Sequence, residues 1–166
     1  ELQRLAEGMT TEPRTAEMLE SADELGRYLD CVTENRVDDL RRQLSQALLH
    51  VGLARFITEV LAPLTTLVGE SWSRGQLQVF EEHLYTEAAQ SLLRGAIATI
   101  PASAVQPRVL LTTFPQESHG LGVLMAEAMF ALEGSRCVPL GTQTPLWEIA
   151  AAARAHVVDG VLASLG

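Results

Sequence analysis

The segment Thr113-Phe114-Pro115-Gln116-Glu117-Ser118-His119-Gly120-Leu121-Gly122 lies between a short apolar run and an apolar helical pattern. This order predicts a strand, a loop and a helix, the place where open α/β sheets bind ligands. A neutral imidazole is a good ligand for a transition metal, and the carboxylate of Glu117 beside His119 can fix its tautomer. The loop therefore predicts a ligand site, and Gly122 lets a bulky group approach the start of the helix closely.

The C-terminal part of the chain follows an alternating pattern of strands and helices. We expect strands at residues 108–113, 137–140 and 157–164, and helices at 121–133 and 145–155. Such a β-α-β-α-β order predicts a parallel, doubly wound sheet of the flavodoxin-like (Rossmann) type. A complete sheet of this type needs roughly two more strands, so we expect the domain, residues 108–166, to be truncated after its third strand.

The N-terminal part predicts a four-helix bundle over residues 15–100. Apolar spacing indicates helices at residues 15–33, 37–51, 53–73 and 76–100, the first of them capped by Thr15. Pro63 should kink the third helix, and Gly75 should end it with a positive φ. Residues 1–14 and 101–107 are polar or rich in proline and are interpreted as linkers.

A second group of residues surrounds the turn between the third and fourth helices. Trp72 ends one helix, and Glu82 and His83 lie almost two turns into the next. Val79, Glu82, His83 and Thr86 share one helical face by their spacing. In an antiparallel hairpin these side chains can meet, and an indole beside a carboxylate and an imidazole would cap a flat ligand with a polar substituent. Each residue taken alone is more often plain core or surface.

Composition limits the classes of protein that this chain can represent. The 166 residues are 47% hydrophobic, enough to bury a core. The net charge of −9 argues against a broad nucleic-acid surface. No uninterrupted apolar run reaches the length of about 18 residues that a membrane span needs, and the start is not a signal peptide. Two widely spaced cysteines favour a reduced, cytoplasmic protein.

Both motifs resemble those of cobalamin-binding proteins. The loop resembles the pattern Asp-x-His-x-x-Gly with a serine on a later strand: Glu117 replaces the Asp, and 41 residues separate Gly122 from Ser164. The spacing of Trp72 and Glu82-His83 resembles the helical bundle of cobalamin-dependent MerR-type regulators, the light-sensing repressors of carotenoid genes. The similarity runs from about residue 37 to residue 166. It includes Gly141 and the pair Thr144-Pro145 that follows it.

This resemblance implies a role for each matching residue. His119 would be the lower axial ligand of cobalt, with Glu117 orienting it, Gly122 making room for the displaced nucleotide tail, and Ser164 close to that tail. Trp72 would cover the upper face, where Val79, Glu82 and His83 contact a 5′-deoxyadenosyl group. The expected cofactor is adenosylcobalamin or another cobalamin. In such proteins light breaks the cobalt–carbon bond, and the homo-oligomer that binds DNA comes apart.

The sequence also departs from the family pattern. A histidine follows the bundle tryptophan in the best-known photoreceptors, whereas this chain has Ser73. The DNA-binding domain expected before the bundle is absent from this chain, so DNA contact would be made only by such a domain.

Three functions remain open at this stage. The first is a cobalamin sensor without catalysis of its own. The second is a corrinoid methyl carrier, which would use His119 in the same way but needs an open upper face. The third is a regulatory relative that keeps the fold without cobalamin. Nothing in the sequence indicates a free-standing enzyme, since no nucleophilic triad or phosphate-binding loop is found.

Overall fold

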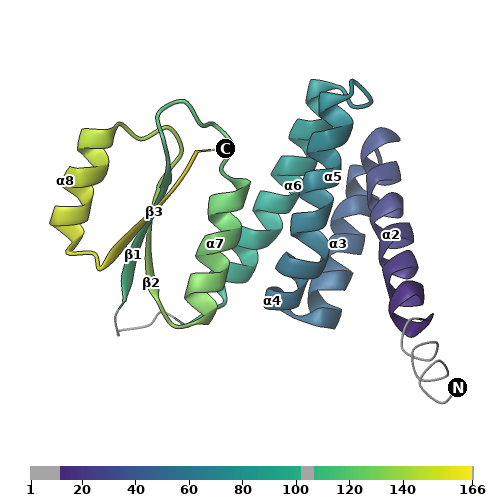
Figure 1. The fold of residues 1–166 in the computed structure, drawn as a ribbon, viewed down its shortest axis with the longest axis horizontal. Coiled ribbons are helices and arrows are strands. Elements are labelled where there is room, and N and C mark those ends of the chain that lie inside the picture. Colours follow the sequence, from purple (N-terminus) through teal and green to yellow (C-terminus); the bar gives the residue numbers. More distant parts are fainter. Residues whose placement is uncertain (1–11, 102–106, 166) are drawn as a thin grey trace, which may run out of the picture.

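The computed structural model describes residues 12–101 and 107–165. The predicted helical bundle followed by a parallel α/β sheet is confirmed (Figure 1). The helical part comprises α2 Glu12–Thr33, α3 Val37–Val51, α4 Leu53–Arg55, the π-helix η1 Phe56–Leu61, α5 Ala62–Ser73 and α6 Val79–Ala98. The α/β part comprises β1 Arg108–Thr113, α7 Leu121–Leu132, β2 Arg136–Gly141, α8 Leu146–His156 and β3 Gly160–Ser164.

The boundaries of the helices and strands differ most from the predicted ones at the starts of α2, α6 and β3. Helix α2 begins at Glu12, so Thr15 lies within the helix and residues 12–14 are not a linker. Pro13 falls in the first turn, where a missing N–H breaks no intrahelical bond. Helix α6 begins at Val79, after Gln78 and Glu81 form a capping box. Strand β3 begins only at Gly160, because the chain turns through a left-handed residue, Val157. Residues 1–11 and 102–106 of the predicted linkers lie outside the described residues.

Pro63 is accommodated by a local widening of the helix. The π-helix Phe56–Leu61 immediately precedes it, and the N–H of Ala62 donates to the carbonyl of Ile57, five residues back. In a regular α-helix the proline ring would meet the carbonyl four residues earlier. A π turn shifts the hydrogen-bond pattern at that point and leaves the helix continuous into α5. At the other end of α5, Gly75 has the predicted positive φ, at 70°.

The sheet has the strand order β2-β1-β3, and both pairings are parallel. Central strand β1 is buried over nearly its whole length, as expected for a strand covered on both faces. Helix α7 covers one face of the sheet and α8 the other (Figure 1). Within the described ranges, no helix combines the length and the hydropathy needed to cross a bilayer.

Helix α7 belongs to two hydrophobic cores at once. On one side Val123 packs with Val109 and Leu111 of the sheet. On the other side Leu121 and Ala128 join the core of the bundle. Figure 1 shows the consequence: α7 stands between the sheet and α6, so the two parts are packed through a shared helix.

The capping box of α6 offers a test of how that helix starts. The backbone N–H of Gln78 donates to Oε2 of the buried Glu81 at 2.8 Å. We expect Glu81→Ala to lower the free energy of unfolding by about 1 kcal/mol, since it removes one half of the box. Glu87→Ala, at an exposed position of the same helix, is the control and should change it much less. Urea denaturation measures both, and equal losses would contradict the capping role.

Candidate ligand-binding site

One cavity of about 510 Å³ brings the two sequence motifs together. It lies between the α5–α6 end of the bundle and the start of α7. Its lining residues come from α5 (Thr65, Val68, Gly69, Trp72), from α6 (Val79, Glu82, His83, Tyr85, Thr86, Gln90) and from the segment that begins α7 (Ser118, His119, Gly120, Leu121, Gly122). We call the α5–α6 hairpin that carries Trp72 the tryptophan hairpin, and the loop between β1 and α7 that carries His119 the histidine loop. Both segments line this one cavity. The volume is within the usual range for small-molecule sites.

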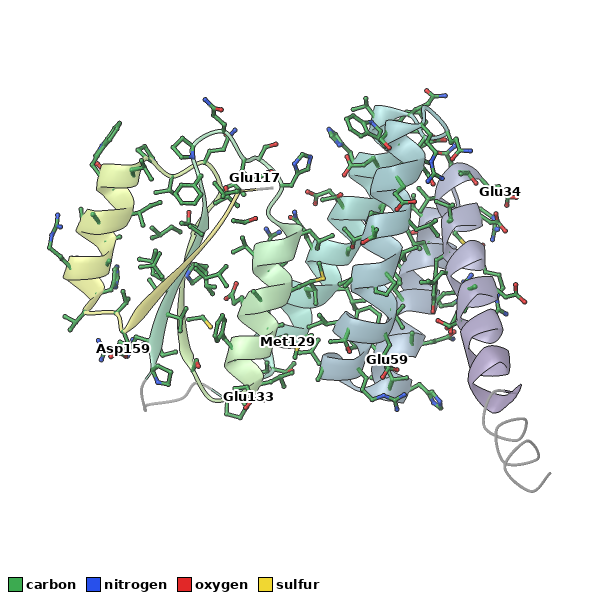
Figure 2. The ribbon with its side chains drawn as sticks, viewed as in Figure 1. Glu34, Glu59, Glu117, Met129, Glu133 and Asp159 are labelled. Carbon is green, nitrogen blue, oxygen red and sulfur yellow. The ribbon has the colours of Figure 1, made fainter. Side chains whose placement is uncertain are left out.

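On the sheet side of the cavity, Glu117 holds His119. The carboxylate oxygen Oε1 lies 2.7 Å from His119 Nδ1 and also accepts the backbone N–H of His119. That backbone bond is the main reason why the pKa of Glu117 falls below its usual value. Glu117 itself is buried, whereas the His119 side chain is 79% exposed. Figure 2 shows Glu117 in the loop that joins β1 to α7.

This pairing determines what the imidazole can do. A carboxylate accepts hydrogen bonds only, so Nδ1 carries the proton and Nε2 keeps its lone pair. An imidazole fixed in this way is suited to bind a metal through Nε2. In the part of the chain that the structure describes, no group of three or more His, Cys, Asp or Glu side chains could hold a metal ion. His119 offers one nitrogen ligand.

The two glycines at the start of α7 differ in their surroundings. A Cβ at Gly122 would meet nothing within 4 Å, so this position borders open space in the cavity. A Cβ at Gly120 would lie only 2.9 Å from Cγ2 of Thr142. Gly122 thus leaves room on the cavity side, whereas Gly120 leaves room for Thr142 of the neighbouring turn.

On the bundle side, Glu82 is part of a small polar network. Oε1 of Glu82 accepts the hydroxyl of Thr86 at 2.7 Å, and Oε2 lies 2.7 Å from Nδ1 of His83. Trp72 lies across from them on α5 and is 48% exposed, although an indole is usually well buried. An exposed aromatic surface beside an ordered carboxylate can stack on a flat ligand and accept hydrogen bonds from it.

The inner end of the cavity is closed by a buried hydrogen bond between the two helices. The hydroxyl groups of Tyr85 and Thr65 lie 2.6 Å apart, and Tyr85 is almost fully buried. Burial raises the pKa of Tyr85 far above its usual value. This hydrogen bond fixes how α5 packs against α6, and therefore how Trp72 of α5 lies relative to Glu82 of α6.

Three predicted site residues lie next to the cavity rather than on its lining. Glu117 lies behind His119. Thr144 contacts the end of β1, with its Oγ1 2.7 Å from Oγ1 of Thr112. Ser164 pairs with Thr113 in the sheet, and its carbonyl accepts the N–H of Phe114. The other six, Trp72, Val79, Glu82, His83, His119 and Gly122, line the cavity.

Several lining residues were not predicted as part of the site. Gln90 continues the face of α6 that carries Glu82 and Thr86, one helical turn further on, so the spacing that had already grouped Thr86 with Glu82 could also have identified Gln90. Thr65, Gly69 and Tyr85 give no such signal. Their position depends on how α5 packs against α6.

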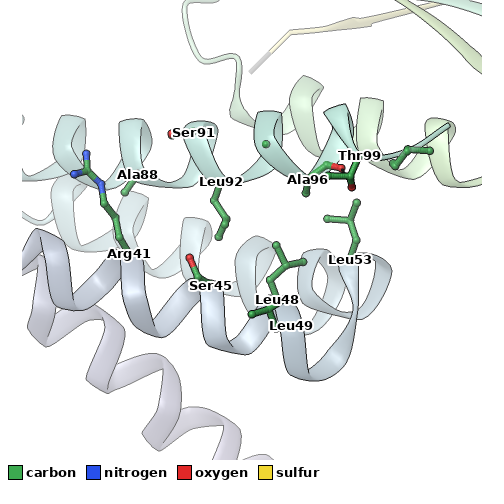
Figure 3. Close-up of a pocket in the computed structure, with 12 residues that line it drawn as sticks. Arg41, Ser45, Leu48, Leu49, Leu53, Ala88, Ser91, Leu92, Ala96 and Thr99 are labelled. Atoms are coloured by element: carbon green, nitrogen blue, oxygen red, sulfur yellow. Dashed lines mark hydrogen bonds between the residues drawn. The ribbon is translucent and has the colours of Figure 1, made fainter. Parts of the chain in front are cut away.

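A second hollow lies on the outside of the bundle. It measures about 610 Å³ and runs between α3 and α6, past Leu48, Leu49 and Leu92 with Arg41 at one end (Figure 3). It is larger than the candidate site but mainly apolar. Its polar side chains do not form a set that suits a defined chemistry, so the candidate site is the cavity that contains both motifs.

Comparison with known protein families defines the class of the helical part. Residues 25–94 match the family model of the B12 binding domain. The matched segment contains Trp72, Glu82 and His83 and ends before His119. The helical part of this chain is therefore similar to the B12 binding domain, and a parallel sheet follows it.

A particular relative then confirms the resemblance that the motifs predict. The chain is 32% identical over 126 residues to the HTH-type transcriptional repressor CarH of Myxococcus xanthus. The aligned part is 76% of this chain and 41% of the relative, so the chain spans about two fifths of the relative's length. Among solved structures, a novel cobalamin-binding protein from Desulfitobacterium hafniense DCB-2 is similar with a TM-score of 0.43 and 14% identity, over 84% of this chain and 67% of that one.

The two glycines give a matched pair of substitutions in the ligand-free protein. Gly120→Ala should destabilise the fold by about 1 kcal/mol or more, because the new methyl group would meet Thr142. Gly122→Ala should leave stability unchanged or raise it by about 0.5 kcal/mol, since alanine favours the helix and the space is open. Thermal unfolding of both variants checks this difference. The opposite order would contradict the geometry described for this loop.

Proposed function

We propose that this chain is the cobalamin-binding sensory part of a transcriptional regulator and has no catalytic activity of its own. The observation that supports this most directly is that Trp72, Glu82, His83, His119 and Gly122 line one cavity. The family match to the B12 binding domain supports the same ligand class. A cytoplasmic location follows from the proposed role.

His119 is the proposed lower ligand of cobalt. Its Nδ1 is held by Glu117, and both His119 and Gly122 line the cavity, where Gly122 leaves open space. Glu117 keeps the imidazole in the tautomer that can bind a metal and limits its rotation. The open space at Gly122, with Ser164 on the neighbouring strand, would take the nucleotide tail that His119 displaces.

The bundle wall suits a ligand with a polar upper substituent. Trp72 supplies an exposed aromatic face, and Glu82, ordered by Thr86, supplies hydrogen-bond acceptors. Val79 and His83 complete this wall. The substituent that best matches a stacking surface beside a carboxylate is a nucleoside, so we propose adenosylcobalamin, which would supply a light-sensitive cobalt–carbon bond.

Ser73 limits what happens after that bond is broken. Its hydroxyl donates to the carbonyl of Glu70 at 2.8 Å, and its side chain is not among those that line the cavity. A serine bonded to its own helix offers no nitrogen for cobalt. We therefore expect the illuminated form to keep one imidazole ligand, that of His119.

The regulatory part of the proposal rests on the relative. That relative is a transcriptional repressor, and the present chain aligns with only 41% of it. We propose that DNA binding depends on a separate domain of the full protein. The sensory part would control it through homo-oligomerisation, which loss of the adenosyl group reverses.

Replacement of His119 tests the ligand assignment. We expect His119→Ala to abolish the absorption spectrum of imidazole-bound cobalamin and to weaken binding by at least 10- to 100-fold, the range seen when support for metal-bound histidines is lost. His50→Ala, at an exposed position of α3, is the control and should behave like the wild type. Visible spectra and a binding titration with adenosylcobalamin in the dark measure both. An unchanged spectrum in the His119 variant would overturn the assignment.

Illumination tests the sensory role. The protein loaded with adenosylcobalamin in the dark should elute as an oligomer on size exclusion, and green light should shift it to smaller species. The same run with methylcobalamin and a corrinoid methyltransferase partner tests the methyl-carrier alternative. Cofactor turnover by the partner without any light-dependent change in size would favour the carrier.

A further inference from the structure

The turn at residues 141–144, beside the histidine loop, contains an unusual backbone. Gln143 has a φ of +59°, in the left-handed region that residues other than glycine seldom adopt. Its N–H donates to the hydroxyl of Thr113 at 2.8 Å, and the N–H of Thr144 donates to the carbonyl of Thr113 at 3.2 Å. A residue in this conformation is strained and persists only where its surroundings hold it. Thr113 is the residue that holds it.

The same hydroxyl also holds the histidine loop. Thr113 is fully buried at the end of β1, and its Oγ1 donates to the carbonyl of Glu117 at 2.5 Å. One hydroxyl therefore accepts from Gln143 and donates to Glu117, so it joins the 141–144 turn to the loop of His119. The carbonyl of Glu117 is two residues from His119, and the Glu117 carboxylate orients the imidazole.

A second contact joins the same two segments. Thr142 lies so close to Gly120 that a Cβ there would be 2.9 Å from its methyl group. The turn thus packs against the residue that directly follows His119, while Thr113 fixes the residue two before it. The loop is thus held after His119 by the turn itself and before His119 by Thr113, which is bonded to the same turn.

We infer that Thr113 is a positioning residue for His119, and that the 141–144 turn is the support against which it acts. This inference rests on the proposed function, because it concerns the alignment of the imidazole with a corrinoid metal. Without the hydroxyl, the carbonyl of Glu117 and the N–H of Gln143 both lose their partner. The loop can then rotate and move Nε2 away from the bonding position.

The neighbouring threonine provides a matched control. Thr112 is also fully buried, and its hydroxyl contacts the same turn through Gly141 and Thr144. Among the described residues, the Thr112 hydroxyl bonds to Thr113, Gly141 and Thr144 and to no residue of the histidine loop. Thr112→Val and Thr113→Val therefore remove the same group from adjacent buried positions, and only the second disconnects Glu117.

The test compares Thr113→Val, Thr113→Ala, Thr113→Ser and Thr112→Val in the full chain. We expect the two variants of Thr113 without a hydroxyl to lose 10- to 100-fold in cobalamin affinity. The nitrogen splitting from imidazole in the electron paramagnetic resonance spectrum of the Co(II) form should weaken in both. Thr113→Ser should restore affinity and spectrum, and Thr112→Val should retain them. Hydrogen exchange in the ligand-free protein should be faster at residues 114–120 in Thr113→Val and Thr113→Ala only.

The outcomes separate this inference from the proposed function. If the wild type binds no cobalamin, the proposed function fails, and hydrogen exchange still reports whether Thr113 orders the loop. If the wild type shows imidazole coordination and the folded Thr113→Val or Thr113→Ala variant matches it, the positioning role is overturned. Failure of both variants to fold, with Thr112→Val folded, would also count against it, because Thr113 would then be a residue of the core.

Discussion

The site depends on helix α7 being packed on two sides. Leu121 and Ala128 are buried in the bundle, while Val123 is buried against the sheet, so the helix cannot move with one part alone. The histidine loop leads directly into this helix, and the tryptophan hairpin lies at the matching end of the bundle. Hydrophobic burial of α7 thereby makes the two loops face each other across one cavity.

Within that frame, the side chains of the site are ordered by short hydrogen-bonded chains. Glu117 orients His119, and Thr86 and His83 bracket Glu82. Each carboxylate is thus next to an imidazole, once on the sheet side and once on the bundle side. The cavity is thus lined by an aromatic side chain, an ordered carboxylate and two histidines. Such a surface can hold a flat ligand that has a metal at its centre and a polar group above it.

Two departures from regular backbone are each accommodated by nearby contacts. The π-helix before Pro63 lets a proline sit in the most buried helix of the bundle. The left-handed Gln143 lets the 141–144 turn fold back under the histidine loop, where Thr113 secures it. Departures from regular backbone are often found near functional sites, where the surrounding structure holds them in place. Here one lies in the helix that leads to Trp72 and the other beneath His119.

The chain's local patterns determined its class of fold and the main side chains of its site. Apolar periodicity predicted the helices and strands, because such patterns are properties of neighbouring residues. The two motifs around His119 and Trp72 indicated side chains that lie on or beside one cavity. The part played by Thr65, Tyr85, Thr113 and Gly120 was decided only by the tertiary structure. Their roles arise from contacts between segments far apart in the chain, such as Thr113 with Gln143, and no local pattern encodes such contacts.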